Sequence, residues 1–202
     1  QAAGGGVRNL NADIIKALPS FFPDEAEQQK IADCLGSLDD LIAAHSRKLA
    51  ALQDHKKGLL QQLFPAEGET TPKLRFSEFE GAEGWNPTTL GKMCKTYSGG
   101  TPSSSNKEFY GGDIPFIRSA EIAREQTALF LSPEGFSKSA AKMVKPGDVL
   151  VALYGANSGD VSVSKMDGAI NQAILCLKSK GNNAFVCYYL TNKKAWILKT
   201  YL

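Results

Sequence analysis

Apolar residues recur at helical spacing along one long stretch near the start of the chain. Residues 24–64 contain no proline, and their apolar positions alternate in steps of four and three. This spacing is typical of a helix that buries a narrow stripe against another helix. Asp24 and Glu27 predict the helix start as a capping box, and Pro65 predicts its end. The stripe, called the seam below, consists of Ile31, Leu35, Leu38, Ile42, His45, Leu49, Leu52, Lys56, Leu59 and Leu63.

The predicted helix is too long for a compact neighbour to cover its seam, because 1.5 Å per residue gives it a length of about 60 Å. Its charge suggests the direction of a partner helix. Residues 24–44 carry six acids and one base, whereas residues 45–64 carry four bases and one acid. An antiparallel pair brings these opposite charges together, so we expect an antiparallel coiled coil. The polar seam residues His45 and Lys56 are of a kind that fixes register.

The pattern changes to short β-rich runs in the second part of the chain. We expect strands at 89–97, 114–118, 149–154, 161–165 and 173–178, and short helical segments at 119–124 and 137–143. Residues 98–106 read as a flexible loop and 155–159 as a glycine-bounded turn. A final amphipathic helix over 182–202 is expected to point Phe185, Tyr188, Tyr189, Trp196 and Ile197 inward. The fold class is therefore α+β: a long coiled-coil helix attached to a mixed α/β domain with several short strands.

Residues 1–23 are expected to depend on another body for their structure. Asn11 can cap a short helix over 13–18, which Pro19 ends. Phe21 and Phe22 then form an extended apolar strip before Pro23. Such a strip cannot fold alone, and it resembles the tail of a domain whose body lies elsewhere. The chain begins with Gln1, which suggests a processed product or a piece of something longer.

Composition favours a cytoplasmic protein with a real core and no membrane span. Hydrophobic residues make up 43% of the chain, and no apolar run approaches the ~20 residues of a membrane helix. Cys34, Cys94, Cys176 and Cys187 are too widely spread for a zinc site, so we interpret them as reduced core thiols. The net charge is −3 over residues 1–80 and +5 over residues 81–202. A mildly basic second part is compatible with a polyanionic partner.

Sequence motifs of catalysis are missing. The glycines at 155–159 lack the lysine and hydroxyl residue of a P-loop. The run at 86–89 is only superficially like the Asn-Pro-Pro-aromatic run of an amino-methyltransferase, and no glycine-rich cofactor loop accompanies it. The two histidines, His45 and His55, both lie on the long helix, so neither a histidine metal site nor a Ser-His-Asp triad can form in the second part. We expect a non-enzymatic chain that needs no cofactor and no metal.

Several motifs resemble one known family. Residues 23–42 and 56–65 resemble the conserved helical spacer of the specificity subunit of type I restriction-modification systems. Residues 73–79, 112–118, 145–151 and 168–172 resemble that family's target recognition domain. The resemblance implies a terminal strip at 1–23, a spacer helix at 24–64, a linker at 65–80 and a recognition domain at 81–202. It also implies that the domain reads one half of a split DNA target, while the spacers set the half-site distance and dock methyltransferase subunits, and through them the restriction subunit.

The chain departs from the family pattern because it has one spacer and one recognition domain. The domain ends short of the family's terminal strip, which residues 1–23 resemble. An antiparallel pair of helices would bring this strip to the domain of a second copy. We therefore expect a two-fold homodimer in which each domain is completed by residues 1–23 of its partner.

On this interpretation, loop side chains of the recognition domain contact double-stranded DNA, with cations on phosphates and hydrogen-bonding groups on bases. An alternative is a coiled-coil assembly scaffold whose domain binds protein. A nuclease that uses carboxylates of residues 81–202 is a third. The candidate DNA contacts are Thr101, Lys107, Arg118, Ser119, Lys138, Lys142, Tyr154, Asn157 and Ser158.

Overall fold

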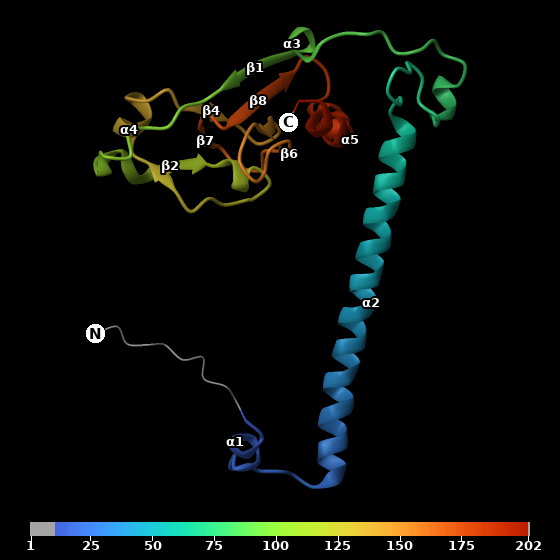
Figure 1. Ribbon diagram of the computed structural model, residues 1–202, viewed down its shortest axis with the longest axis vertical. Helices are drawn as coiled ribbons and strands as arrows, with labels where there is room; N and C mark the ends of the chain where they lie inside the picture. Colours follow the sequence, from blue (N-terminus) through green and yellow to red (C-terminus); the bar gives the residue numbers. More distant parts are fainter. Residues whose placement is uncertain (1–10, 202) are drawn as a thin grey trace. The chain divides into compact units, whose positions relative to one another are not determined.

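The computed structural model describes residues 11–201, and the chain consists of two units with their boundary between His55 and Lys56. The first unit contains α1 (Ala12–Lys16) and most of α2 (Glu25–Leu63), which runs on into the second unit (Figure 1). Asn11 caps α1 by accepting a hydrogen bond from the Ile14 amide at 3.0 Å. The Asp24 carboxylate accepts one from the Glu27 amide at 2.9 Å. Both predicted helix starts are confirmed, and α2 ends one residue before the expected end.

The seam of α2 is exposed from Ile31 to Lys56 in the single chain. Leu35 retains 58% of its accessible surface and Leu49 also 58%, and no residue from 11 to 57 is buried. Exposed leucines and isoleucines at the spacing of a helix-pairing stripe indicate a surface built for contact with another helix. The pairing itself stays a prediction.

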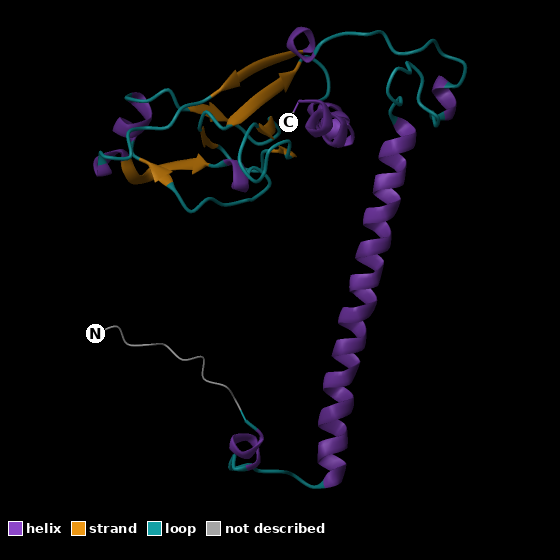
Figure 2. Cartoon of the chain, viewed as in Figure 1, coloured by secondary structure: helices purple, strands orange, loops and turns teal. Residues whose placement is uncertain are grey.

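The second unit contains two four-stranded sheets (Figure 2). The first sheet is antiparallel throughout, and its strand order is β1 (Cys94–Ser98), β8 (Ile174–Ser179), β5 (Val149–Ala152) and β6 (Val161–Val163). The second sheet has the order β3 (Phe130–Leu131), β2 (Tyr110–Ile117), β7 (Gly168–Ile170) and β4 (Lys142–Val144). Within it β2 and β7 run parallel, and the other neighbours are antiparallel. The short helical elements of the unit are η1 (Ser77–Phe79), α3 (Leu90–Met93), η2 (Lys107–Phe109), η3 (Ser119–Glu121) and α4 (Pro133–Ser137).

Strand alternation divides the core into layers. Leu150 of β5 and Ile170 of β7 belong to one buried cluster, which joins the two sheets. Val149 points to the other side of β5 and packs with Leu190 of the last helix, α5 (Asn183–Tyr201). A third cluster contains Phe116 and lies on the remaining side of β2. Because successive side chains of a strand point to opposite faces, the short apolar strands can serve two layers at once.

The prediction for the inward face of α5 is confirmed for two of its five residues, because Tyr189 and Ile197 pack against the cluster that contains Val149 and Leu190. Val186, Cys187 and Leu190 are the buried residues of α5. Of the side chains predicted to point inward, Phe185, Tyr188 and Trp196 are 37–47% exposed, and Tyr189 and Ile197 are half-buried. The aromatic rings of α5 meet a different neighbour. Phe185 lies 5.4 Å from the ring of Phe64 and 5.8 Å from that of Trp85, both in the segment that follows α2.

That segment, expected to be a linker, is held by many contacts. Phe64 is 6% exposed, and the Arg75 guanidinium donates to the carbonyls of Phe79, Ala82 and Glu83. Lys193 of α5 donates to the Pro65 carbonyl at 3.4 Å. Residues 64–85 therefore pack as part of the second unit.

Two further expectations need correction. The predicted helix at 137–143 is wrong. Ser132 caps α4, which ends at Ser137, and Lys142 is part of β4 and pairs with β7. The predicted strand at 89–97 begins with α3, and β1 starts only at Cys94. Three cysteines are buried free thiols as expected, whereas Cys34 is exposed on α2. Within residues 11–201, no helix is long and apolar enough to cross a membrane.

Candidate nucleic-acid interface

One edge of the second sheet collects polar side chains from several strands. Ile117 and Ile170 pair in the parallel β2 and β7, so Arg118 and Asn171 leave the sheet at the same edge. Lys142 starts β4 directly opposite Ile170. In the other sheet, the Leu153 amide donates to the Ala173 carbonyl at 2.8 Å and so brings the end of β5 to this edge. The connection 171–173 between β7 and β8 is the centre of the arrangement.

The glycine-rich loop at 98–106 is attached to the same connection. Thr101 donates to the Gln172 side-chain oxygen at 2.7 Å, and the Gly99 amide donates to the Asn171 carbonyl at 3.2 Å. A Cβ atom on Gly99 would lie only 1.8 Å from the Ile170 carbonyl oxygen, so this close approach requires glycine. The loop expected to be flexible is therefore anchored, and Thr101 has a defined place.

Arg118 is oriented by a buried carboxylate. Its Nε and Nη2 donate to Glu121 at 3.1 and 2.8 Å, while the Arg118 side chain stays 50% exposed and that of Glu121 only 3%. Hydrogen bonds from Arg118 and from Thr127 lower the pKa of Glu121 to about 2 despite its burial. The paired carboxylate raises the pKa of Arg118. A fixed guanidinium with one exposed side can offer its remaining donors to DNA, and Ser119 follows it in η3.

The turn at 155–159 has one outward residue and two that hold the turn. Tyr154 is 50% exposed. Asn157 donates to the Asp160 carboxylate at 3.2 Å, and Ser158 donates to the Leu153 carbonyl at 3.0 Å. The pKa of Asp160 is lowered, chiefly by its hydrogen bond from Lys194 of α5. Tyr154 is therefore the member of this group with a side chain free to reach a ligand.

Lys107 and Lys138 lie at a neighbouring corner formed by η2 and α4. Ser132, the cap of α4, also donates to the Glu108 carbonyl of η2 at 2.7 Å. Lys138 is the C-cap residue of α4 and forms an ion pair with Glu134 at 2.6 Å, whereas Lys107 is exposed. Gly100 brings the loop close to this corner, because a Cβ atom added at Gly100 would lie only 2.6 Å from the Cβ atom of Ala140.

Two residues of the site, Asn171 and Gln172, were missed by sequence reasoning. Asn171 accepts a hydrogen bond from the Ala173 amide at 3.0 Å, and Gln172 accepts the one from Thr101. The signal was present: two amide side chains directly follow the apolar run Gly168-Ala-Ile. Amides both donate and accept, which suits them to reading base edges. We call Thr101, Arg118, Lys142, Tyr154 and Gln172 the edge cluster.

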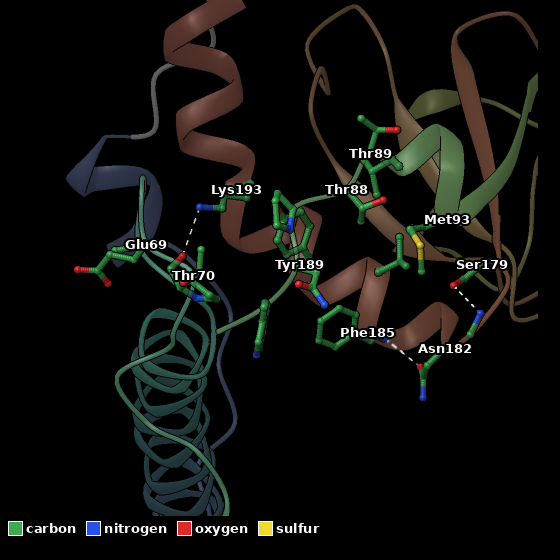
Figure 3. Close-up of a pocket in the computed structure, with 18 residues that line it drawn as sticks. Glu69, Thr70, Thr88, Thr89, Met93, Ser179, Asn182, Phe185, Tyr189 and Lys193 are labelled. Atoms are coloured by element: carbon green, nitrogen blue, oxygen red, sulfur yellow. Dashed lines mark hydrogen bonds between the residues drawn. The ribbon is translucent and has the colours of Figure 1, made fainter. Parts of the chain in front are cut away.

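A separate cavity of about 500 Å³ lies between residues 65–89 and α5. Figure 3 shows Phe185, Tyr189 and Lys193 extending from α5 into this region. None of the predicted DNA contacts lines this cavity. In the part of the chain that the structure describes, no group of three His, Cys, Asp or Glu side chains is placed to hold a metal ion.

Comparison with known proteins gives a consistent result. The family model described as "Type I restriction modification DNA specificity domain" matches residues 82–201. A type I restriction enzyme specificity subunit of Methanocaldococcus jannaschii, MjaX, is 29% identical over 91% of this chain and 44% of its own length. The HindI specificity subunit of Haemophilus influenzae is 29% identical over 98% of this chain and 57% of its own length. The chain thus spans about half the length of these relatives.

Solved structures show the same fold. The HsdS subunit of Thermoanaerobacter tengcongensis matches with a TM-score of 0.53 at 22% identity, over 89% of this chain and 44% of that one. The S subunit of M. genitalium matches with a TM-score of 0.52 at 15% identity, over 87% and 44%. The long helix and the mixed α/β domain predicted from the sequence are therefore confirmed. The family is one of DNA recognition rather than catalysis, and the chain belongs to it: this protein is a member of the type I restriction modification DNA specificity domain family.

Proposed function

We propose that this chain reads one half-site of a bipartite double-stranded DNA target through the edge cluster. The observation that carries the proposal is the convergence of Thr101, Arg118, Lys142 and Tyr154 on the connection 171–173 of a domain whose family is defined by DNA specificity. These side chains supply cationic and hydroxyl groups and Gln172 adds an amide, a combination that suits phosphates and base edges together.

Within the cluster we assign two roles. Gln172 and Arg118 contact bases, because an amide and a guanidinium held in place by Thr101 and Glu121 can form directional hydrogen bonds. Lys142, with Lys107 and Lys138 at the neighbouring corner, contacts phosphates. Lys142 and Lys107 are exposed, and the single ion pair of Lys138 leaves it 63% exposed. Ser119, Asn157 and Ser158 act mainly by shaping the loops.

The role proposed for α2 is to set the distance between two half-sites. Its exposed seam pairs antiparallel with the α2 of a second copy, so that the dimer presents two identical recognition domains. Residues 1–23 of each copy complete the domain of the other. By family analogy the paired helices dock the methyltransferase subunits of a type I complex, and through them the restriction subunit, in the cytoplasm.

A mobility-shift titration against random-sequence duplex at 50 and 200 mM salt tests the DNA-binding step. Contacts with several phosphates predict an affinity loss of about 10-fold or more between these salt concentrations. The control is the Lys107→Ala/Lys142→Ala double variant, which should bind more weakly and with a shallower salt dependence. Binding that is absent, or that is insensitive to salt and to both lysines, would instead favour the scaffold alternative with a protein ligand.

A further inference from the structure

A second hollow lies at the C-terminal end of α2 and is almost entirely apolar. Its volume is about 660 Å³, and it is open to solvent. Leu59 and Leu63 of α2 form one side, Leu74, Phe76 and Phe79 another, and Tyr188 of α5 a third. Phe76 and Phe79 are 66% and 61% exposed, values unusual for large apolar residues that surround a concave surface. We call these six residues the apolar groove.

The chain carries an unpartnered apolar group of matching character just before the start of the same helix. Phe21 is 99% exposed and Phe22 is 78% exposed, between Pro19 and Pro23. Phe22 precedes Pro23, which favours extended backbone at Phe22, and adjacent side chains of an extended segment point to opposite sides. Their exposure in the single chain leaves roughly 1.5–3 kcal/mol of burial free energy unused for each ring.

The seam fixes which residues of two antiparallel helices meet. One register places Leu38 beside Leu49 of the second copy and Leu35 beside its Leu52. It also sets Asp39 and Asp40 level with the basic pair Arg47 and Lys48. Sliding the helices by one heptad puts Arg47 level with the Arg47 of the second copy in one direction and Asp40 level with its Asp40 in the other, and both pairs are repulsive. Charge therefore selects the first register.

In this register the seam residues that lie next to the groove face no apolar residue of the second copy. Leu59 and Leu63 come level with Gln28 and Asp24 of the second copy, neither of which is apolar. Phe22 precedes Asp24 by two residues, a reach of up to about 7 Å in extended chain. The two leucines that lack a seam partner are also the seam leucines that line the groove.

We infer that Phe21 and Phe22 of a second copy of this chain fill the apolar groove. The inference rests on the antiparallel pairing of the proposed function and deepens it, because it names the residues through which one copy completes the other. Each dimer contains two such contacts, related by its two-fold axis. The groove is then an intermolecular core rather than a site for a small molecule.

Disulfide trapping between two differently tagged variants tests this contact. A Phe22→Cys chain is mixed with a Phe76→Cys chain, both in a Cys34→Ser background to remove the exposed native thiol. The matched control replaces Phe76→Cys with Phe130→Cys, an exposed phenylalanine of β3 that does not line the groove. We expect a covalent heterodimer with the Phe76→Cys chain in at least about 10-fold higher yield than with the Phe130→Cys chain. Equal yields from the two mixtures would overturn the inference.

Sedimentation of the same samples under reducing conditions tests dimerisation separately from the groove contact. A dimer that gives no selective cross-link leaves the antiparallel pairing intact and refutes the groove contact. A monomer at micromolar concentration refutes both. Independently, the Phe21→Ala/Phe22→Ala variant should weaken dimerisation by about 100-fold or more, since four rings per dimer lose their burial, whereas Phe130→Ala should change it less than about threefold.

Discussion

Residues 11–57 leave their apolar side chains exposed, whereas the recognition domain buries many of its own. The domain buries its leucines, isoleucines and valines in three clusters between and around two sheets. Along α2, by contrast, Leu35, Leu38 and Leu49 are all more than half exposed, and no residue from 11 to 57 is buried. The domain thus packs its apolar side chains within its own chain, whereas the proposed function gives the exposed helix half of an interface. Variants in the two regions should therefore fail differently, one by dissociation and the other by unfolding.

The largest effect is expected from a charge in the seam. Leu38→Asp places a carboxylate among the leucines of the proposed helix pair, where an unpaired charge is poorly solvated. We expect the dimer dissociation constant to rise at least about 1000-fold, which corresponds to about 4 kcal/mol. Analytical ultracentrifugation measures it. Ala50→Asp, a helix position outside the seam, is the control and should change dimerisation by less than about tenfold; equal behaviour of the two variants would contradict the seam.

The next largest effect is expected from a glycine substitution in the recognition domain. Gly99→Ala forces a methyl group into the Ile170 carbonyl, which the backbone can avoid only by moving the loop away from the connection 171–173. We expect the free energy of unfolding to fall by about 3 kcal/mol in urea titrations. Gly91→Ala is the matched control, because nothing lies within 4 Å of its Cβ position and it sits in α3. This control should be neutral or stabilising by up to about 1 kcal/mol; similar losses for both variants would contradict the close packing of the loop.

The buried carboxylate of Glu121 should give an effect of similar or slightly smaller size that depends on pH. Its pKa of about 2 lies below the ordinary value of 4.5, so its stabilising contribution is present above pH 4.5 and is lost as the pH falls toward 2. Glu121→Gln should reduce stability at pH 7 by about 2–3 kcal/mol and by much less near pH 3. Glu125→Gln, which removes an exposed ion pair with Lys165, should cost less than about 1 kcal/mol. A loss for Glu121→Gln that did not shrink in acid would exclude this explanation.

The smallest expected effects concern DNA. Gln172→Ala should lower affinity for the preferred sequence by about 1–3 kcal/mol and relax preference at one position. Lys142→Ala should instead weaken binding to all sequences alike, by about 1 kcal/mol or less, and flatten the salt dependence. Fluorescence anisotropy with preferred and scrambled duplexes distinguishes the two. Uniform losses for both variants would refute the division into base and phosphate contacts.

The sequence predicted the elements whose pattern is local. The 4-3 spacing and the Asp24 cap located α2 almost to the residue, and the apolar run at 149–154 located β5. It could not predict faces set by distant neighbours. Phe185 of α5 faces the segment after α2 rather than a sheet, and no periodicity within α5 contains that information.

The site residues could likewise be predicted only where their signal is local. Thr101 and Arg118 were named from a loop and a strand end, and Lys142 from the expected short helix, but their convergence depends on the parallel pairing of β2 with β7 across more than fifty residues of sequence. Asn171 and Gln172 were missed because two amides after a strand resemble any solvated turn. Only the register of Ile117 with Ile170 places them at the centre. The helix that was expected at 137–143 failed because Ser132 and Pro133 start a helix earlier, and β4 is held by pairing with β7.

Selection of bound sites from randomised DNA by the dimeric protein tests the central claim most directly. Two identical recognition domains joined by antiparallel helices predict an enriched motif made of two inverted half-sites at a fixed spacing, and that motif should disappear with Leu38→Asp. Enrichment of an asymmetric site, of one half-site alone by the intact dimer, or of no sequence at all would contradict it.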